Sequence, residues 1–541
     1  MFFYYSAGIK ALMQFLLINP YYPIGETPSP PLGLAYLAAA LERAGVKVKI
    51  LDFVVFPYSF ISLEKVMKAF KPDFVGATAV TMTFYKAIDV LQDAKRIDPD
   101  VVTVMGGPHI TFCAEETLIL YPELDCVVLG EGEATIVELI REGKSVNQWH
   151  HIPGLVFRIG TEIYHTKNNR PPIDIKTLPL PARHLIPLGR YRALNMPISM
   201  TTSRGCPHKC IFCVGRKMVG SRVRYRRPNE VVNELEYLST LSFPQINIAD
   251  DLFTADKSHC TAICDEIINR GIKTKWTSFS RVDTVSYGLL KKMKDAGCCC
   301  VSFGVETANA RILKTIKKGI TLQQTINAVN ICFEAGIEPT VSFILGLPGE
   351  TPDTLNETLE FGAKLKRMGI GFGYHLLAPF PGTTVREKSK ELGIRILTDD
   401  WAQYHANRAV AETEFVTKSM LDAIVVDWEQ KYLKLLGEIE AEIKADSADK
   451  ERASILLNLE RTVLLYEWMM DRIIETHGVV DDNINNGSKD DAFKNLVSKI
   501  ESLTVHPHEK IYRALNHTVS QGDLIYAGES SQRRWRWVDY F

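Results

Sequence analysis

The chain alternates short apolar runs with helical segments in two successive blocks, and this alternation constrains the fold more than any other feature. In residues 14 to 143, five apolar runs are separated by segments such as LGLAYLAAALERAG, a helix that ends at Gly45. Strands joined by helical crossovers pair in parallel and are covered on both faces. The first block therefore predicts a doubly wound parallel sheet. Its strand candidates are QFLLINP, VKVKILDF, DFVGATAV, VVTVMGG and DCVVLGEGE.

The second block, residues 197 to 380, repeats the alternation with six strand candidates: PISMTTS, INIADD, KTKWTSFS, CCVSFGVE, PTVSFILG and FGYHLLAP. Six strand–helix units in this length predict a partial or full barrel, and a partial (β/α)6 barrel is the form expected here. Past residue 395 the strand candidates stop, and segments such as DAIVVDWEQKYLKLLGEIEAEIKA predict long amphipathic helices. The expected fold class is α/β, with a doubly wound sheet, a partial barrel and a mostly α-helical C-terminal region.

These changes of pattern also predict where the domains end. The proline-rich stretch between the blocks is interpreted as a linker on the surface. The apolar residues before Met13 are interpreted as a short extension, with Met13 as an alternative start, and the C-terminal helices are expected to cap the barrel mouth. The expected units are 1–12 (N-terminal extension), 13–145 (first α/β domain), 146–196 (linker), 197–395 (barrel) and 396–541 (helical C-terminal domain).

Composition narrows the classes of partner. The formal net charge is -1, which gives no reason to expect nucleic acid or an anionic membrane. No apolar run reaches the roughly 18 residues of a transmembrane helix. The 11 cysteines are too sparse for a disulfide scaffold, and the run Cys298–Cys300 suits buried thiols. A reducing cytoplasm is the expected compartment.

Three other cysteines stand close together in SRGCPHKCIFCVG, directly after the first barrel strand. Cys206, Cys210 and Cys213 are separated by three and then by two residues. Thiolates at such spacing bind soft metals, but a structural zinc site needs a fourth ligand, and His208 lies too close to its neighbours to serve. An iron–sulfur cluster held by three cysteines would keep one iron open. That position at the carboxyl end of a barrel strand is where catalytic groups collect.

This motif, Cys-x3-Cys-x-aromatic-Cys with Phe212 as the aromatic residue, resembles the signature of radical S-adenosylmethionine (SAM) enzymes. The resemblance implies that the three cysteines hold a 4Fe–4S cluster whose fourth iron is chelated by SAM. It also implies that one electron from the cluster cleaves SAM to a 5′-deoxyadenosyl radical. The fourth ligand would then be the cosubstrate itself.

Later strand ends add to the resemblance in the same order along the chain. INIADDLF matches loosely a segment that contacts the SAM amino group, SFGVET places a carboxylate suited to a ribose hydroxyl, and VSFILGLPGE resembles a glycine motif beside the adenine. HLLAPFPGT follows the sixth strand, as in many members. The SAM-binding residues implied by the resemblance are Asp250, Asp251, Glu306, Gly346 and Gly349.

The first block resembles the cobalamin-binding domain that precedes the radical SAM barrel in a large subfamily. PPLGLAYLAAALERAG, GGPH and GEGE are typical of its members, and no G-x-G-x-x-G follows the first strand, which disfavours a dinucleotide. Glycines at the strand ends allow backbone to approach a bulky ligand. The residues assigned to cobalamin are Thr78, Thr81, Gly106, Gly107, Gly130 and Gly132. A degenerate sheet that has lost the ligand is the alternative.

One departure concerns the cobalt ligand. The motif Asp-x-His-x-x-Gly, whose histidine ligates cobalt in methionine-synthase-type domains, is not found in the sequence. His109, in GGPHIT, is interpreted as a loop histidine, so cobalamin is expected to bind without histidine ligation. The loop containing Thr78 and Thr81 would then cover the lower face of the cobalamin, or that face would stay open.

The segment RKMVGSRVRYRRP, residues 216 to 228, carries six positive charges close to the cysteines. It is interpreted as a loop packed against the following helix. A site for phosphate, carboxylate or RNA is the alternative.

Together these resemblances imply a cobalamin-dependent radical SAM enzyme that methylates an unreactive centre of a small-molecule or biosynthetic substrate. Its cofactors would be a 4Fe–4S cluster, SAM and cobalamin, and its electron donor a flavodoxin or ferredoxin. One alternative is an oxidative cyclase or rearrangement enzyme, like relatives of the anaerobic magnesium-protoporphyrin cyclase. A second is a tRNA methylthiotransferase, although only Cys113 and Cys126 precede the trio where that family has three further cysteines. A non-catalytic zinc or cobalamin-sensing protein is the alternative of another class.

Overall fold

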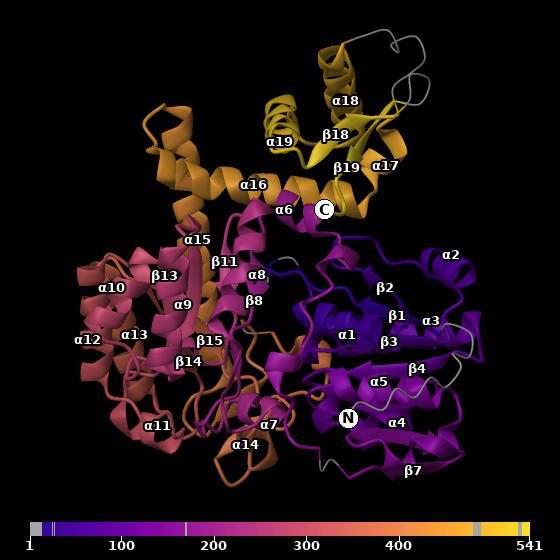
Figure 1. Ribbon diagram of the computed structural model, residues 1–541. Helices are drawn as coiled ribbons and strands as arrows, with labels where there is room; N and C mark the ends of the chain where they lie inside the picture. Colours follow the sequence, from indigo (N-terminus) through magenta and orange to yellow (C-terminus); the bar gives the residue numbers. More distant parts are fainter. Residues whose placement is uncertain are drawn as a thin grey trace.

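The structure is a computed structural model of the 541-residue chain. It describes residues 13–23, 25, 27–167, 170–405, 407–479, 488–528 and 533–541. The N-terminal extension expected over residues 1–12 lies outside the described residues. A parallel sheet, a second parallel sheet and a helical C-terminal region follow one another along the chain (Figure 1), so the expected fold class is confirmed.

The first sheet has seven strands in the order β2-β1-β3-β4-β5-β6-β7. Side chains of β1 alternate between two cores: Phe15 and Leu17 pack in the core of α1 and α5, and Leu16 and Ile18 pack in the core of α2, α3 and α4. The sheet is thus covered on both faces, as parallel strands require. The elements are β1 (Gln14–Asn19), α1 (Leu32–Arg43), β2 (Lys47–Asp52), α2 (Phe60–Phe70), β3 (Phe74–Thr78), α3 (Phe84–Ile97), β4 (Val102–Gly106), α4 (Ala114–Leu120), β5 (Cys126–Val128) and α5 (Glu133–Glu142).

Part of the segment 146–196, which was expected to be a linker, extends this sheet. β6 (Leu155–Ile159) pairs antiparallel with β5, and β7 (Glu162–His165) pairs antiparallel with β6. The stretch from residue 155 to 165 holds no proline, and Gly160 turns the hairpin with a φ of +57°. The prolines that suggested a linker flank the hairpin without entering it. Residues 170–187 run irregularly apart from two short 3-10 turns.

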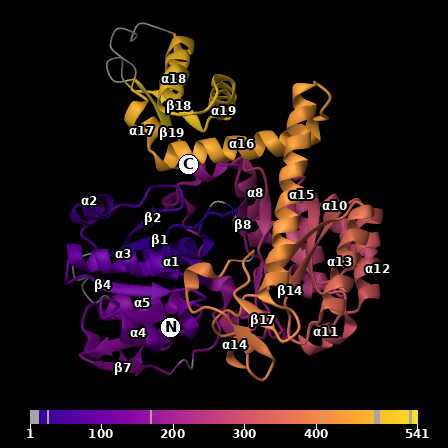
Figure 2. The same cartoon turned by 180° about the vertical axis from the view of Figure 1, so that it is seen from behind.

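The second sheet has six parallel strands in the order β15-β14-β13-β12-β11-β8. The first and last strands of this order are not paired with each other, so the barrel is partial. Helices cover its outer face (Figures 1 and 2). The elements are β8 (Ile198–Met200), α8 (Pro228–Thr240), β11 (Ile246–Ile248), α9 (Lys257–Asn269), β12 (Trp276–Ser280), α10 (Tyr287–Asp295), β13 (Cys298–Glu306), α11 (Ala310–Thr315), α12 (Leu322–Ala335), β14 (Glu338–Leu345), α13 (Pro352–Arg367) and β15 (Gly371–Leu376).

Helices dominate the rest of the chain. α15 begins at the barrel mouth, where Leu421 lies beside Gly346. α16, α18 and α19, however, lie at the opposite end of the molecule from α14 and from α7 (Gly215–Val219), as Figure 1 shows. The expectation that the tail caps the mouth is therefore wrong for most of its length. The elements are α14 (Thr384–Glu387), β16 (Ile394–Ile396), β17 (Ala411–Thr413), α15 (Lys418–Lys444), α16 (Lys450–Met470), α17 (Ile473–His477), α18 (Lys489–Leu503), α19 (His508–Ser520), β18 (Leu524–Ala527) and β19 (Arg534–Trp537).

A buried arginine anchors this C-terminal region to the rest of the protein. Arg190, in α6 (Leu188–Ala193), forms ion pairs with Glu475 and Asp539. Arg192 on the same helix pairs with Asp523. The C-terminal region thus contacts α6, just before the first barrel strand. The carboxyl ends of the barrel strands face the first sheet.

Candidate active site

The cysteine loop lies between β9 (Ser203–Arg204) and α7 (Gly215–Val219), at the carboxyl end of β8. Gly205 starts the loop with a φ of +117°, and a Cβ there would collide with the Arg222 carbonyl oxygen, so only glycine fits. Farther along, the Ile211 amide donates to the Ile316 carbonyl, and Ile211 packs in a small apolar core with residues near α14. The loop is therefore held at both its start and its centre.

On this loop Cys206 and Cys210 are partly exposed and Cys213 is exposed, and none of them forms a disulfide within the described residues. Burial raises the pKa of Cys210 and of Cys213, while nearby Lys318 lowers both. Within the described ranges no three His, Cys, Asp or Glu side chains surround one point as a single-ion site. Each thiolate of an iron–sulfur cluster binds its own iron, so the trio does not need to converge on one ion. Soft thiolate donors on one anchored loop fit such a cluster.

The two aspartates after β11 have different surroundings. Asp250 is buried, and its carboxylate accepts hydrogen bonds from the Thr202 amide (2.6 Å), the Thr202 hydroxyl and the Ser203 hydroxyl (2.7 Å). Asp251 is exposed and accepts from the Gly205 amide at 3.0 Å. Asp250 therefore braces the start of the cysteine loop with no face left for a ligand, whereas Asp251 remains accessible beside that loop.

Glu306 ends β13 with a φ of +71° and is only 8% exposed. Its carboxylate pairs with the Lys318 ammonium at 2.6 Å, and Lys318 is equally buried. The Lys318 backbone carbonyl accepts from Arg281, and its ammonium lies 5.9 Å from the centre of the Phe212 ring. Lys318 thus links Glu306 to the cysteine loop. The sequence analysis did not single out this lysine. In the stretch TIKKGIT nothing distinguishes Lys318 from Lys317 as the partner of Glu306.

The glycines of VSFILGLPGE form a tight loop after β14. Gly346 and Gly349 have φ values of +84° and +78°, which favour glycine. Inside the loop Glu350 is fully buried and accepts from the amides of Gly346 (2.6 Å) and Leu347 (3.2 Å). Burial raises the pKa of Glu350 to about 7, although these two hydrogen bonds lower it. The carboxyl group therefore holds the loop shape from within.

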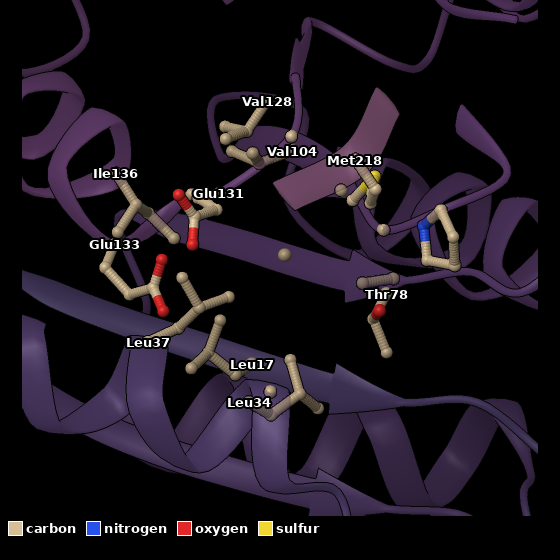
Figure 3. Close-up of a pocket in the computed structure, with 18 of the residues that line it drawn as sticks. Leu17, Leu34, Leu37, Thr78, Val104, Val128, Glu131, Glu133, Ile136 and Met218 are labelled. Atoms are coloured by element: carbon tan, nitrogen blue, oxygen red, sulfur yellow. The ribbon is translucent and has the colours of Figure 1, made fainter. Parts of the chain in front are cut away.

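A cavity of about 270 Å³ opens at the carboxyl ends of the first sheet. Apolar side chains of β1, α1 and α5 form its floor, and Glu131, Glu133 and Met218 surround its rim (Figure 3). Among the assigned cobalamin residues, Thr81 does not line the cavity, whereas the others do: Thr78, Gly106, Gly107, Gly130 and Gly132.

Two of these glycines lie where the wall of the cavity is tightly packed. A Cβ on Gly107 would lie 2.7 Å from the Ala79 carbonyl oxygen, and one on Gly132 would lie 3.1 Å from Val128 Cγ1. Backbone lines the cavity at these points, as a bulky planar ligand at the end of a doubly wound sheet requires. Met218 and Val219 of α7 complete the wall, so the cavity lies directly against the helix that follows Cys213. By its position at the strand ends and its apolar, backbone-rich lining, the cavity would hold part of a cobalamin, a molecule larger than the enclosed 270 Å³.

His109 does not line this cavity. Its ring is 1% exposed and packs against Phe84 and Trp401, with centroid distances of 4.5 and 4.9 Å, and its Nδ1 lies 3.3 Å from the Thr81 hydroxyl. Burial, together with the charge of Arg386, lowers the pKa of His109 to about 4. The histidine is therefore a neutral packing residue, and Thr81 is its partner.

An ion-pair cluster, which we call the arginine clamp, joins the cavity to the cysteine loop. Arg204 pairs with Glu133 (2.6 Å) and Glu131 (3.2 Å), and Arg224 pairs with Glu131 at 2.8 Å. Arg204 also lies over the Tyr36 ring at 4.9 Å. Sequence reasoning singled out only the glycines of GEGE and missed its carboxylates. Arg226 of the basic segment likewise pairs with buried Glu234, so these arginines have partners inside the chain.

Comparison with known proteins gives two matching family models: the B12 binding domain over residues 26–140 and the Radical SAM superfamily over residues 200–362. An uncharacterized methyltransferase of Pyrococcus horikoshii is 36% identical over 406 residues, which cover 74% of this chain and 86% of that protein. The chain belongs to the cobalamin-binding radical SAM family. It is therefore an enzyme of the class whose cofactors are a 4Fe–4S cluster, SAM and cobalamin.

Other members of this family extend the comparison. The anaerobic magnesium-protoporphyrin IX monomethyl ester cyclase of Rubrivivax gelatinosus is 28% identical over 438 residues, 78% of each chain. The fold is shared with the cobalamin-dependent SAM radical enzyme OxsB, at a TM-score of 0.67 and 18% identity over 96% of this chain and 82% of that one. Among the described residues no helix is long and apolar enough to span a membrane.

Proposed function

We propose that this family member is a methyltransferase that transfers a methyl group from SAM, by way of cobalamin, to an unreactive centre of a small molecule. The observation that carries this proposal is the contact between the two sites. α7 starts two residues after Cys213 and supplies Met218 and Val219 to the cavity wall. Two cofactors held this close can act on one substrate. The relative from Pyrococcus horikoshii, itself called a methyltransferase, supports the proposal.

When bound, the cluster and SAM supply a 5′-deoxyadenosyl radical, and cobalamin supplies a methyl group. The chain's own residues position these groups. Cys206, Cys210 and Cys213 would each bind one iron, and Asp251 would accept a hydrogen bond from the SAM amino group beside the loop. Gly346 and Gly349 would let the loop after β14 approach the adenine, with Glu350 fixing that loop from inside.

We revise the remaining assignments. Glu306 would reach a ribose hydroxyl only through the carboxylate edge that Lys318 leaves free, because one oxygen is already paired. Asp250 acts as a brace, not as a ligand, because three hydrogen bonds already occupy its carboxylate. Glycines 106, 107, 130 and 132 together with Thr78 would line the cobalamin site, with no histidine on the cobalt.

The electron donor and the compartment are also proposals. A flavodoxin or ferredoxin would supply the electron to the cluster. Cysteines that form no disulfide within the described residues, together with an oxygen-sensitive cluster, suit a reducing cytoplasm.

The experiment uses the fact that methyl transfer consumes SAM in two ways. Anaerobic protein reconstituted with iron, sulfide and cobalamin is incubated with SAM and a reductant, and both S-adenosylhomocysteine and 5′-deoxyadenosine are measured. A methyltransferase forms the first product in a cobalamin-dependent way even without its substrate, for one round. If 5′-deoxyadenosine forms while S-adenosylhomocysteine never does, a cyclase or rearrangement function, as named for the Rubrivivax gelatinosus relative, replaces this proposal.

A further inference from the structure

A groove between α16 and α19 lies in the C-terminal region, at the opposite end of the molecule from α7 (Figure 1). It encloses a cavity of about 200 Å³. On each helix the lining residues recur at spacings of four and then three, so one face of α16 meets one face of α19. The residues at these spacings are Ser454, Asn458 and Arg461 on α16, and Lys510, Ala514 and His517 on α19.

Arg461 is a half-buried cation on the α16 side of this groove. Its Nη2 donates to the Asn458 side-chain oxygen at 2.9 Å, and its Nε is buried with no hydrogen-bond partner among the described residues. It also forms no ion pair with any residue that the structure describes. Burial lowers the pKa of Arg461, and the charge of Asp523 opposes this only in part. The guanidinium therefore lacks the counter-charge that a buried cation normally has.

More deeply buried arginines of this chain do have such a counter-charge. Arg183 and Arg226 each pair with Glu234 at 2.6 Å, and Arg190 pairs with Asp539 at 2.7 Å. An unpaired charge removed from water is costly, so the chain elsewhere places a carboxylate beside the guanidinium. At Arg461 the same role is left for a ligand.

Glu460, the carboxylate among the described residues that line the groove, is already paired. Its Oε1 lies 2.6 Å from Lys510 Nζ, and its Oε2 lies 2.9 Å from Arg513 Nη2. Together with Arg461, three cations and one carboxylate line the groove, which leaves a net charge of +2. Burial, together with the charge of Arg461, lowers the pKa of His517, so this ring adds a hydrogen-bond donor without adding charge at neutral pH.

A phosphate monoester matches these donors in charge and in geometry. It carries about −1.5 to −2 charges at neutral pH, which balances the lining. Arginine binds phosphate oxygens with two parallel N–H groups, and lysine adds a point charge. Leu457 and Leu464 supply the apolar part of the lining, where the organic portion of an ester would lie.

We propose that the groove between α16 and α19 binds a small molecule that carries a phosphate monoester, with Arg461, Lys510 and Arg513 around the phosphate. The enclosed cavity between two helices suits a small ligand better than a nucleic-acid strand, which needs basic residues along an open surface. This site goes beyond the proposed methyl transfer and does not depend on it, because it lies far from the cysteine loop (Figure 1).

Both helices of the groove are tied to the segment before the barrel. The Thr462 hydroxyl of α16 donates to the Leu194 carbonyl at 3.1 Å, and Asp523, which follows α19, pairs with Arg192 at 2.6 Å. A ligand that bridges α16 and α19 would hold these two attachments together. Because only the folded groove binds it, the ligand should also raise the midpoint temperature of unfolding.

The test is isothermal titration calorimetry on the anaerobic, reconstituted full chain, in a buffer free of phosphate and sulfate. The phosphate probes are glycerol 3-phosphate, ribose 5-phosphate and inorganic phosphate. Ribose lacks the phosphate, and succinate carries two charges as carboxylates. We expect saturable binding of both esters, with one site per chain, and no binding of ribose or succinate.

Three variants locate the site. Arg461→Gln should weaken ester binding at least about tenfold, because it removes charge-assisted hydrogen bonds to the phosphate. Arg452→Gln is the matched control and should bind normally, since Arg452 lies on the same helix but pairs with Glu442 outside the groove. Lys510→Gln removes a second cation from a more exposed position and should weaken binding about threefold. It tests the site even if Arg461→Gln does not fold.

Four results would overturn the assignment. The first is no saturable binding of any phosphate probe. The second is ester binding that neither Arg461→Gln nor Lys510→Gln weakens, which would place the ligand elsewhere. The third is succinate binding as tightly as the esters, which would remove the preference for phosphate. The fourth is binding of inorganic phosphate with no binding of either ester, which would show that the groove admits only the free ion.

Discussion

Glu350 gives the protein a pH dependence that can be worked out from its surroundings. The carboxyl group is fully buried under the glycine loop after β14, where it accepts two backbone hydrogen bonds. Its second oxygen, Oε1, has no hydrogen-bond partner among the residues that the structure describes. Burial therefore disfavours the charged form, and the pKa rises from 4.5 to about 7 in the folded protein.

Because the folded protein binds this proton more tightly than the unfolded chain does, the carboxyl group adds more to the free energy of unfolding at low pH than at high pH. The contribution is complete below pH 4.5, the value of the unfolded chain, and is lost as the pH rises through 7. Between pH 5.5 and 8.5 the loss amounts to about 2 kcal/mol of unfolding free energy. Glu350→Gln keeps an acceptor for both amides and cannot ionise, so this variant should lack the loss.

The assay is urea unfolding of the protein and of Glu350→Gln from pH 5.5 to 8.5, with the difference between them plotted against pH. That difference removes the contributions of all other titrating groups. Glu334→Gln, an exposed carboxylate on α12, is the matched control and should follow the unaltered protein. A difference between the protein and Glu350→Gln that stays flat across this range would refute the reasoning, because it would mean that the Glu350 carboxylate is not desolvated.

Three other predictions concern the cofactor sites. Cys213→Ala, like the same change at the other two loop cysteines, should abolish cluster-bound iron and SAM cleavage, whereas Cys298→Ala, in a buried strand, should keep the iron content measured by colorimetry. His109→Ala should keep cobalamin binding and leave the cobalt(II) paramagnetic resonance spectrum without nitrogen splitting; any change in that splitting would make His109 a ligand. Gly107→Ala should lower cobalamin affinity at least about tenfold in spectrophotometric titration, because its Cβ meets backbone at 2.7 Å. Gly45→Ala, at a φ of +82° with open space around it, should bind cobalamin normally and isolate the cost of the backbone conformation.

Local sequence patterns predicted most helices, most strands and the cysteine loop, because each of these depends on a short stretch of sequence. The apolar run of β1 is sufficient to predict a buried strand, and the spacing of the three cysteines is sufficient to indicate a cluster. The β6–β7 hairpin was missed because nearby prolines outweighed the short alternating run at residues 155–165. A neighbouring proline restricts only the residue before it, so it says little about a hairpin several positions away.

Roles that depend on distant partners could not be predicted. Asp250 and Asp251 are adjacent in the sequence, but only the fold shows that Thr202 and Ser203 occupy the first and leave the second accessible. In the same way Thr81 stands three residues after Thr78, yet its side chain faces His109 and not the cavity. A shift of one or a few positions along the chain changes which surroundings a side chain contacts. The residues that it contacts are tens of positions away in the sequence, so a local pattern does not reveal them.

The arginine clamp has a consequence for exchanging parts between members of the family. Arg204 and Arg224 belong to the barrel half of the chain, and Glu131 and Glu133 belong to the sheet half. A hybrid that joined one half of this chain to a relative without the matching residues would keep two largely buried arginines or two largely buried carboxylates without partners. Such hybrids should assemble only when all four residues are transplanted together. The point at which two of these enzymes can be joined is therefore determined by the arginine clamp and not by the end of either domain.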